Sequence, residues 1–447
     1  MKTNNFSRKQ SHYKGNTISD KLGAKLINKV ARECGYKKRS GGKIKAKSLI
    51  VGFMMMVSKK MNTYESWASE VSLLVGKSLT RQAIDSRMNS ETHAMLKNLM
   101  EDYLRASIQQ THLKDKDAIT SKYGSIVIED SSTLGLPAEL SATFPGNVSQ
   151  GEKKAQAKIH ALYNYTDTSF SLLHVHSYRQ NDQSLSANSL PYLKSGDLLL
   201  RDMGFLKISV LKKLDSNGIQ FITRKTASVK VYDSATGTEV NLIKALKKHS
   251  CFDKQVLIGT EEQLKLRLVI LPLPPEQFAE RRRKAKQSRD KRLNHSKAYY
   301  QLLGYAIYLT NIPRETADAK EVKYLYRLRW QIEMIFKSWK NCFSIEKMIP
   351  QKCNNPERIY CMIYLMLIYI IIFQAVWFNA CRNKLKSRDT ELELSLLKMA
   401  KFFAQHFHLI FTLNDDKKIR KQIEIHCCYD ARKDRLNTMQ KYGKLAA

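Results

Sequence analysis

A long apolar run in the last quarter of the chain limits the architectures that this sequence can adopt. Residues 359–373 are apolar without a break, and after one glutamine the apolar residues 375–378 continue the run. Such a segment either spans a membrane or forms a helix that is buried on all sides in a large core. The run contains three tyrosines, a cysteine and a glutamine, and a charged stretch precedes it. We therefore expect a buried core helix and no membrane partner.

The charge of the chain indicates a polyanionic partner. Among 447 residues, 76 are Lys or Arg and 41 are Asp or Glu, which gives a formal net charge of +35. A surface this basic favours DNA or RNA. The eight cysteines form no C-x-x-C pair, and MKTNNFSRKQ at the N-terminus has no apolar core of a signal peptide. Both observations predict a cytoplasmic protein.

The N-terminal quarter of the chain has helical periodicity. Apolar positions recur at helical spacing over residues 17–110, and residues 63–90 read as two short helices around Gly76. The second of these carries Arg81 and Arg87 on its polar side. It is either a recognition helix that contacts DNA or an ordinary amphipathic helix of a bundle.

From Tyr123 the periodicity changes to that of strands. GSIVIED and GDLLLRD are short apolar runs that end in acids, and residues 158–178 form a predicted hairpin around 166–168. A helix closed by Gly218 and the strand IQFITR follow. Residues 219–277 are rich in strands and turns, and the basic stretch 280–297 is either a solvated charge run or a surface that tracks phosphates. This alternation predicts an α/β protein with a mixed sheet.

One later segment presents charged residues on a single stripe. If residues 324–340 form one helix, four polar side chains lie within an arc of about 60°: Tyr326, Arg329, Glu333 and Lys340. Lys337 lies beside this arc. A separate face carries Leu328, Ile332, Ile335 and Trp339 and can pack on a core. The stripe is either a solvated face with ion pairs or a carboxylate flanked by cations that serves a site.

Two of the predicted strands end in acids that favour the second interpretation. Asp130 follows SIVIE and Asp202 follows DLLLR. Carboxylates from adjacent strand ends and a third from a helix suit two Mg²⁺ ions, which take oxygen ligands and clamp both oxygens of a phosphodiester displacement. The flanking cations would hold the DNA phosphates that bare acids repel.

These residues resemble a known family. Tyr326, Arg329, Glu333 and Lys340 fit Y-x2-R-x3-E-x6-K without a gap, the signature of a large group of DDE transposases of bacterial insertion sequences, the insertion sequence family four type. EDSST with the following LP resembles the first aspartate motif of that family, and RDMGF resembles the second. AIYLTN resembles the strand that leads to the signature. The resemblance covers roughly residues 120–375.

The resemblance implies an RNase H-like fold and a catalytic triad. Asp130, Asp202 and Glu333 would be the catalytic, metal-binding acids, with Mg²⁺ as two ions that Mn²⁺ can replace. Glu129 beside Asp130 is an alternative if the strand register differs by one, and the family pattern of Asp followed by small residues favours Asp130. Tyr326, Arg329 and Lys340, with Lys337 beside them, would contact DNA near the cleaved strand.

Further expectations concern partners and intermediates. The resemblance implies binding to the terminal repeats of the element and to target DNA, and synapsis of two ends favours a homodimer. In some relatives an aromatic side chain of the insertion stacks a flipped base while a hairpin forms. No tryptophan lies between residues 203 and 329, so the candidates here are Phe221, Tyr232 and Phe252.

These observations predict five parts along the chain. They are a helical, DNA-binding N-terminal domain (1–118), the first part of the RNase H-like core (119–218), a β-rich insertion (219–299), the second part of the core (300–380) and a helical C-terminal region (381–447).

Two alternatives differ in class. A tyrosine recombinase would use H-x-x-R, which His176 and Arg179 supply in isolation, but no catalytic tyrosine stands out and the motif falls on a strand-like run. A non-catalytic DNA-binding protein would share the charge but has no need of three acids together. The chain has no G-x-S-x-G elbow, and GYKKRSGGKI has the wrong spacing for a P-loop.

Overall fold

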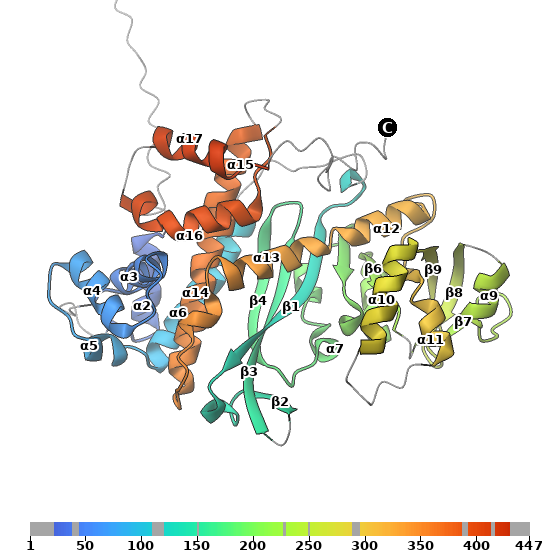
Figure 1. Cartoon of the computed structure of the whole chain (residues 1–447), viewed down its shortest axis with the longest axis horizontal. Helices are drawn as coiled ribbons and strands as arrows, with labels where there is room; N and C mark the ends of the chain where they lie inside the picture. Colours follow the sequence, from blue (N-terminus) through green and yellow to red (C-terminus); the bar gives the residue numbers. More distant parts are fainter. Residues whose placement is uncertain are drawn as a thin grey trace, which may run out of the picture. The chain divides into compact units, whose positions relative to one another are not determined.

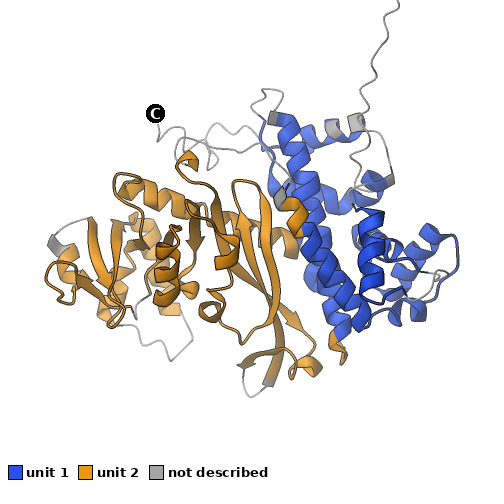
Figure 2. Cartoon of the chain, turned by 180° about the vertical axis from the view of Figure 1, so that it is seen from behind, with its two compact units in different colours: residues 1–103, 341–348, 357–429 blue, residues 104–340, 349–356, 430–447 orange. Residues whose placement is uncertain are grey.

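The structure is a computed structural model that describes residues 22–37, 44–109, 120–149, 152–226, 229–248, 251–287, 296–386, 392–412 and 416–429. The chain forms two compact units, which Figure 2 distinguishes by colour. Unit 1 comprises Met1–Tyr103, Asn341–Met348 and Glu357–Tyr429, and unit 2 comprises Leu104–Lys340, Ile349–Pro356 and Asp430–Ala447.

Unit 1 is helical in its described residues, as the periodicity of both ends of the chain predicted (Figure 1). Its helices are α2 (Ala24–Glu33), α3 (Ala46–Ser58), α4 (Tyr64–Val75), α5 (Arg81–Asp85), most of α6 (Ser90–Gln109), η5 (Ile345–Met348), α14 (Pro356–Ile371), η6 (Ile372–Phe378), α15 (Asn379–Lys386), α16 (Leu396–Thr412) and α17 (Asp416–His426). Residues 430–447 of the predicted C-terminal region lie outside the described residues.

The apolar run is a buried helix, as predicted. Within the described residues, Pro356–Leu385 is the one helix with the length and composition to cross a membrane, with a mean hydropathy of 2.3, and 89% of that apolar window is buried. Tyr369 in α14 packs its ring on Phe343 and on Phe407 of α16, with centroids 5.2 and 5.1 Å away. Aromatic side chains of neighbouring helices therefore cover this helix.

Unit 2 is built on one mixed sheet of ten described strands (Figure 1). The strands are β1 (Ile126–Leu136), β2 (Pro145–Ser149), β3 (Glu152–Asn164), β4 (Ser169–Ser177), β5 (Leu198–Arg201), β6 (Gln220–Arg224), β7 (Val231–Asp233), β8 (Phe252–Ile258), β9 (Leu264–Pro272) and β10 (Tyr305–Thr310). The order is β2-β3-β1-β5-β6-β10-β9-β8-β7, and β4 pairs with β3.

Within this sheet, the order β4-β3-β1-β5-β6 is that of an RNase H-like core. The first three strands are antiparallel neighbours, whereas β5 lies parallel to β1 and β6 parallel to β5. The turn between β3 and β4 confirms the predicted hairpin. The mixed α/β sheet predicted from the sequence is therefore confirmed.

The strands after β6 extend the same sheet rather than forming one of their own. β10 pairs with both β6 and β9, so β9, β8 and β7 continue outward from the core. The helices of this region are α9 (Leu242–Lys248), α10 (Pro275–Gln287) and α11 (Lys297–Leu302). The predicted basic helix is α10 as far as residue 287, and its residues 288–295 lie outside the described residues.

The two faces of the core sheet are covered by different helices. On one face, Val127 of β1 and Leu199 of β5 share a core cluster with Val210, Leu211 and Leu214 of α8 (Ile208–Ser216). On the other face, Phe170 of β4 contacts Trp339 of α13, and Tyr308 of β10 contacts Tyr326 of α12. Short elements fill the remaining connections: η1 (Thr120–Lys122), η2 (Ala138–Leu140), α7 (Asp182–Leu185), η3 (Leu190–Tyr192) and η4 (Met203–Phe205).

The expectation of a single helix over residues 324–340 is wrong. Two helices, α12 (Ala319–Arg327) and α13 (Trp330–Asn341), meet at Leu328 and Arg329. The chain tightens into a turn there, because four amides bond to the carbonyl three residues back: those of Leu328, Arg329, Gln331 and Ile332. The predicted apolar face is nevertheless correct, since Ile332, Ile335 and Trp339 are buried.

Candidate active site

The first candidate acid, Asp130, lies on β1 and faces the side of the sheet that α13 covers. Alternation along the strand sends its neighbour Glu129 to the opposite face. One carboxylate oxygen of Asp130 accepts a hydrogen bond from the Ser131 amide at 2.8 Å, and the other accepts one from Arg329 Nη1 at 2.8 Å. The side chain is 18% exposed. The strand register thus brings Asp130, and not Glu129, to Arg329 at the turn between α12 and α13.

The second candidate acid, Asp202, directly follows the last residue of β5. It stands at the N-terminus of the short helix η4, and its side chain makes no capping bond there. Oδ1 of Asp202 accepts a hydrogen bond from the Tyr326 hydroxyl at 3.5 Å. The carboxylate lies on the same face as Asp130, because β1 and β5 are parallel neighbours whose pairing stops at Glu129 and Arg201. The prediction that both aspartates follow strand ends holds for Asp202 only, since β1 continues to Leu136 and Asp130 lies within it.

The third candidate acid, Glu333, lies in the first turn of α13. Its carboxylate accepts a hydrogen bond from Arg329 Nη2, while the other terminal nitrogen of the same guanidinium bonds to Asp130. Arg329 is therefore a bridge between two acids that are about 200 residues apart in the sequence. The tightened turn between α12 and α13 places this guanidinium, because Arg329 is the residue at which the two helices meet.

The three candidate acids are close enough to influence one another's ionisation. The pKa of Asp130 is raised to about 6, chiefly by burial and to a smaller extent by Asp202 and Glu333, against the lowering effects of Arg329 and the Ser131 amide. Burial alone would lower the pKa of Arg329, but Tyr326, Asp130 and Glu333 around it raise that pKa overall. The site thus holds three carboxyl groups and one guanidinium, that of Arg329, so its acidic groups outnumber its basic ones.

The residues of this pocket fit a divalent cation. The described residues contain no ready-made group of three or more His, Cys, Asp or Glu in metal-holding geometry. The donor set nevertheless consists of carboxylate oxygens, which are the ligands that Mg²⁺ and Mn²⁺ prefer. Asp202 and Glu333 both raise the pKa of Asp130, and the Arg329 guanidinium lies between two of the acids, so negative charge is concentrated in this pocket.

The other predicted DNA-binding residues lie in different surroundings. Lys337 is exposed on α13, and Lys340 lies half-buried near the end of the same helix. In unit 1, Arg81 is exposed in the first turn of α5, whose N-cap is Thr80. Arg87 instead packs over the Tyr36 ring at 4.9 Å and donates to the Tyr36 carbonyl, so part of its guanidinium has a structural role.

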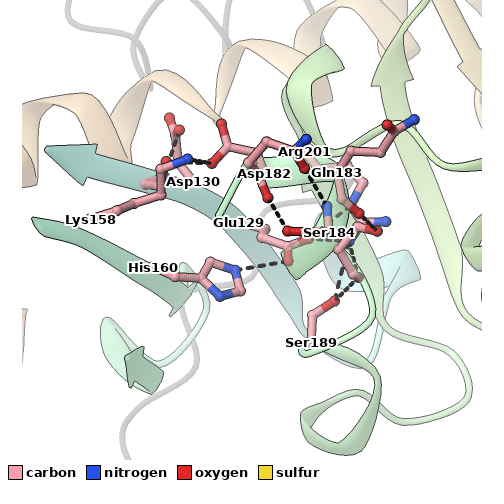
Figure 3. Close-up of polar contacts among 12 residues, drawn as sticks. Glu129, Asp130, Lys158, His160, Asp182, Gln183, Ser184, Ser189 and Arg201 are labelled. Atoms are coloured by element: carbon pink, nitrogen blue, oxygen red, sulfur yellow. Dashed lines mark hydrogen bonds and ion pairs between the residues drawn. The ribbon is translucent and has the colours of Figure 1, made fainter. Parts of the chain in front are cut away.

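A buried polar network behind the acids was not found by sequence reasoning (Figure 3). Glu129 accepts hydrogen bonds from His160 Nε2 at 3.0 Å and from Arg201 Nε at 2.8 Å, and none of these three side chains is exposed. The only sequence signal was the pair of charges, Glu129 and Arg201, that precede the two aspartates. Their burial depends on the pairing of β1 with β5, which local periodicity does not specify.

A second network involves Ser131, the residue after Asp130 on β1, and Lys158 of β3. Oδ1 of Asp182, at the start of α7, accepts hydrogen bonds from the Ser131 hydroxyl and from Lys158 Nζ, both at 2.9 Å (Figure 3). Gly204, two residues after Asp202, lies against the same carboxylate, since a Cβ there would be 3.2 Å from it. Asp182 therefore touches the segments that carry both aspartates.

A cavity of about 940 Å³ opens beside these contacts within unit 2. Its lining combines cations, acids and one aromatic ring, including Lys158, Tyr178, Arg179, Asp182, Met203 and Lys207. Met203 and Gly204 of the lining follow Asp202 in the chain, but the three candidate acids themselves are not among the lining residues. Its mixed polar lining suits a polar, partly anionic segment rather than an apolar ligand.

Two expectations about other residues can be compared with the structure. Phe221 is fully buried and Phe252 is nearly so, both in the core of unit 2, which leaves Tyr232 as the half-buried candidate for stacking a base. The H-x-x-R run begins on β4, and burial, together with His160 and His174, lowers the pKa of His176 to about 4. An imidazole that stays neutral on a strand does not resemble the helical site of a tyrosine recombinase.

Comparisons with known proteins identify the family of the chain. The profile of the family described as the transposase DDE domain matches residues 123–372. The chain is 26% identical over 421 residues to the transposase of insertion sequence element IS1151 of Clostridium perfringens, which covers 89% of this chain and 87% of that protein. It is 28% identical over 412 residues to the transposase of IS231D of Bacillus thuringiensis subsp. finitimus, which covers 86% and 84%.

A solved structure, the piggyBac transposase in a synaptic complex with hairpin DNA, aligns with 95% of this chain and 85% of its own at 12% identity and a TM-score of 0.42. The family match spans all three candidate acids and the signature around Glu333, and the two bacterial relatives match over most of their length. The chain therefore belongs to the transposase DDE domain family, as a DDE transposase of an insertion sequence.

Proposed function

We propose that this transposase cuts and joins the ends of its own element with Asp130, Asp202 and Glu333 as its catalytic, metal-binding acids. One observation carries the proposal. The guanidinium of Arg329 joins Asp130 to Glu333, and Tyr326 on the preceding helix bonds to Asp202, so residues of the signature reach all three acids. A structural role alone does not require three acids that repel one another in one pocket.

Transposases of this family use divalent metal ions, and we propose two Mg²⁺ ions here, which Mn²⁺ can replace. When bound, they would activate a water or a 3′-hydroxyl and neutralise charge on the leaving oxygen. The chain supplies the rest of the site. Asp130 lies on β1 and Asp202 directly follows its parallel neighbour β5, whereas Glu333 lies in the first turn of a packed helix. Rigid elements of this kind hold ligands better than loops do.

DNA is the macromolecular partner that we propose, both as terminal inverted repeats and as target. Tyr326, Arg329, Lys337 and Lys340 would lie along the cleaved strand, because they belong to the same turn and helix as Glu333. Arg329 pairs with acids in this DNA-free chain, so binding of DNA and metal would release it to a phosphate.

Roles for the parts of the chain follow from the same proposal. The helical region 1–118, with Arg81 and Arg87, would bind the terminal repeats. Residues 119–218 and 300–380 would form the catalytic core around the insertion 219–299, and the C-terminal helices from 381 would help two copies to assemble on paired ends. We propose that the protein acts as a homodimer in the synaptic complex, on the nucleoid in the cytoplasm and without a membrane partner.

Cleavage of a DNA fragment that carries the ends flanking this gene tests the proposal. The reaction is run with Mg²⁺, with Mn²⁺ and with EDTA, for the wild type and for Asp130→Ala, Asp202→Ala and Glu333→Gln. We expect metal-dependent nicking at the element boundary that each substitution abolishes, while DNA binding in a gel-shift assay stays within about twofold, since no phosphate contact is removed.

Each other outcome has a definite meaning. Full activity in one variant removes that residue from the site. Cleavage that persists in EDTA contradicts the metal mechanism and favours a tyrosine recombinase, which would leave a covalent protein–DNA adduct. Tight binding without cleavage under any metal would indicate a DNA-binding role alone.

A further inference from the structure

The buried network behind the candidate acids has a place in the fold that suggests a use. The parallel pairing of β1 with β5 ends at the register pair Glu129 and Arg201. Each of these residues comes immediately before a candidate acid, Asp130 or Asp202. Because side chains alternate along a strand, the ion pair lies on one face of the sheet and the two aspartates lie on the other.

The contacts of this pair fix more than its own two side chains. Arg201 donates from Nε and Nη2 to the same oxygen of Glu129, and Nη2 also reaches the Ser186 carbonyl at 2.8 Å and the Ser189 hydroxyl at 3.3 Å. His160 on β3 holds the other oxygen of Glu129 at 3.0 Å. The strand that carries Asp130 is therefore tied laterally to strands on both of its sides.

An aromatic ring extends the network beyond Asp202. Phe205 in η4 is fully buried, and its ring stacks on His160 with centroids 5.5 Å apart, while the Arg201 guanidinium lies 5.8 Å from the ring centre. Asp202 is thus flanked in the chain by Arg201 on one side and by Phe205 on the other, and both belong to the network. Its backbone has little freedom to move relative to β1.

Stability alone does not account for such a network. The desolvation of a fully buried ion pair is costly, and apolar side chains of similar volume are often neutral or more stabilising in its place. Within the described residues, Arg201 Nη1 and His160 Nδ1 have no hydrogen-bond partner, so the network is not even fully satisfied. What an ion pair adds over an apolar pair is directional bonds, which hold two backbones in one register.

We propose that Glu129 and Arg201 are positioning residues that set the separation of Asp130 and Asp202 for binding divalent ions. The inference rests on the proposed catalytic role of those aspartates. Side chains that hold the ligands of a metal typically change metal affinity by about 10- to 100-fold when they are removed. Loss of the pair should therefore weaken metal binding without removing any ligand.

The chain offers a matched control in the same sheet. Arg267 of β9 is buried and binds Asp253 of β8 through two bonds, Nε to Oδ1 at 2.7 Å and Nη2 to Oδ2 at 2.8 Å. In the strand order, β9 is separated from β5 by β6 and β10. Breaking this pair also leaves a buried charge without its partner, but it does not touch either strand that carries an aspartate.

The experiment titrates Mn²⁺ into the full-length, metal-stripped chain and follows free Mn²⁺ by electron paramagnetic resonance. The variants are Glu129→Gln, Arg201→Met, Arg201→Lys and the apolar double variant Glu129→Leu with Arg201→Met. The control is Asp253→Asn, which leaves Arg267 without its ionised partner. Thermal unfolding of each variant is measured in EDTA. The Mg²⁺ concentration at half-maximal end cleavage and the KM for the DNA end are measured as a second readout.

We expect the dissociation constant for Mn²⁺ to rise about tenfold or more in the Glu129 and Arg201 variants, and the Mg²⁺ midpoint to rise with it while the KM for DNA stays unchanged. The apolar double variant should show the same defect although it unfolds near the wild-type temperature, and Arg201→Lys should recover part of the affinity. The control should lose stability and keep its affinity for Mn²⁺.

Failure of the inference can be told apart from failure of the proposed function. If Asp130→Ala or Asp202→Ala binds Mn²⁺ as the wild type does, or the wild type binds none, the proposed metal site is wrong. If those variants lose Mn²⁺ but the Glu129 and Arg201 variants retain wild-type affinity, the positioning role is overturned. An equal loss of affinity in the control pair would also overturn it, because the effect would then follow stability. Should the double variant not fold, Arg201→Lys tests the positioning role instead, and wild-type affinity for Mn²⁺ in that variant would overturn it.

Discussion

The carboxylate of Asp130 should reduce the stability of the metal-free chain at neutral pH. Burial and the nearby acids raise its pKa from 3.8 to about 6. A raised pKa means that the folded chain disfavours the ionised form, so its contribution to stability is present at low pH. That contribution is lost as the pH rises from about 4 to about 6 and stays lost above that range.

The magnitude follows from the two pKa values. The difference between 3.8 and about 6 corresponds to about 3 kcal/mol in the free energy of unfolding. The side chain is 18% exposed, so solvent screening removes only part of this. Asp130→Asn cannot ionise, and it therefore escapes the penalty. The stability of the variant minus that of the wild type should rise by up to about 3 kcal/mol between pH 4 and pH 6.5, and then level off.

The assay compares the two proteins rather than two pH values of one protein. Chemical or thermal unfolding is followed from pH 4 to pH 8 in EDTA, and the difference in the free energy of unfolding is plotted against pH. A constant offset from the hydrogen bonds that the asparagine changes does not affect the slope. Adding Mg²⁺ should then stabilise the wild type and not the variant, because only the wild type retains all three acids.

An opposite control is available on the surface of the same unit. The amides of Thr236 and Ala235 bond to Asp233 and lower its pKa. Its ionised form is therefore favoured by folding, and for Asp233→Asn the difference from the wild type should fall, not rise, as the pH increases. A flat or falling difference for Asp130→Asn would refute the account of the acidic pocket.

Three further predictions concern the site and the helical unit. In Arg329→Gln the pKa of Asp130 should move above about 6, because Arg329 is the strongest influence that lowers it. The difference in the free energy of unfolding that Asp130→Asn causes should then keep rising to a higher pH in this background, and an unshifted curve would contradict the prediction. Lys340→Ala should weaken binding of the element end and reduce the slope of log affinity against log salt by about 0.9, the value for one phosphate contact; an unchanged slope counts against that contact. Gly52→Ala should cost about 1–3 kcal/mol in thermal unfolding, because a Cβ there would lie 2.5 Å from Val71 Cγ2, and a variant as stable as the wild type would show that α3 and α4 can separate without cost.

Features that depend on local spacing were predicted correctly from the sequence. The hairpin between β3 and β4, the helix closed by Gly218 and the buried apolar helix each rest on a pattern within a few residues. Local patterns of this kind express propensities and amphipathic periods that the tertiary structure had no reason to override. The family resemblance rested on the same short motifs, which is why the comparisons agree with it.

The arrangement of these elements was decided by tertiary structure. Whether Glu129 or Asp130 enters the site depends on the pairing of β1 with β3 and β5, and a shift of one residue would exchange their faces. The turn at Arg329 divides a segment whose periodicity indicated one helix, and the periodicity of the sequence did not show that this residue joins two distant acids. No local sequence pattern pointed to Asp182, because its partners Ser131 and Lys158 lie on β1 and β3, far from it in the sequence.

The sequence by itself therefore determined which side chains are available for the chemistry and on which kind of element each lies. Only the tertiary structure decided which of them meet. The physical reason is that hydrogen bonding along a helix or strand is local, whereas strand order, register and the burial of a charge pair are settled by contacts between segments that are far apart in the chain.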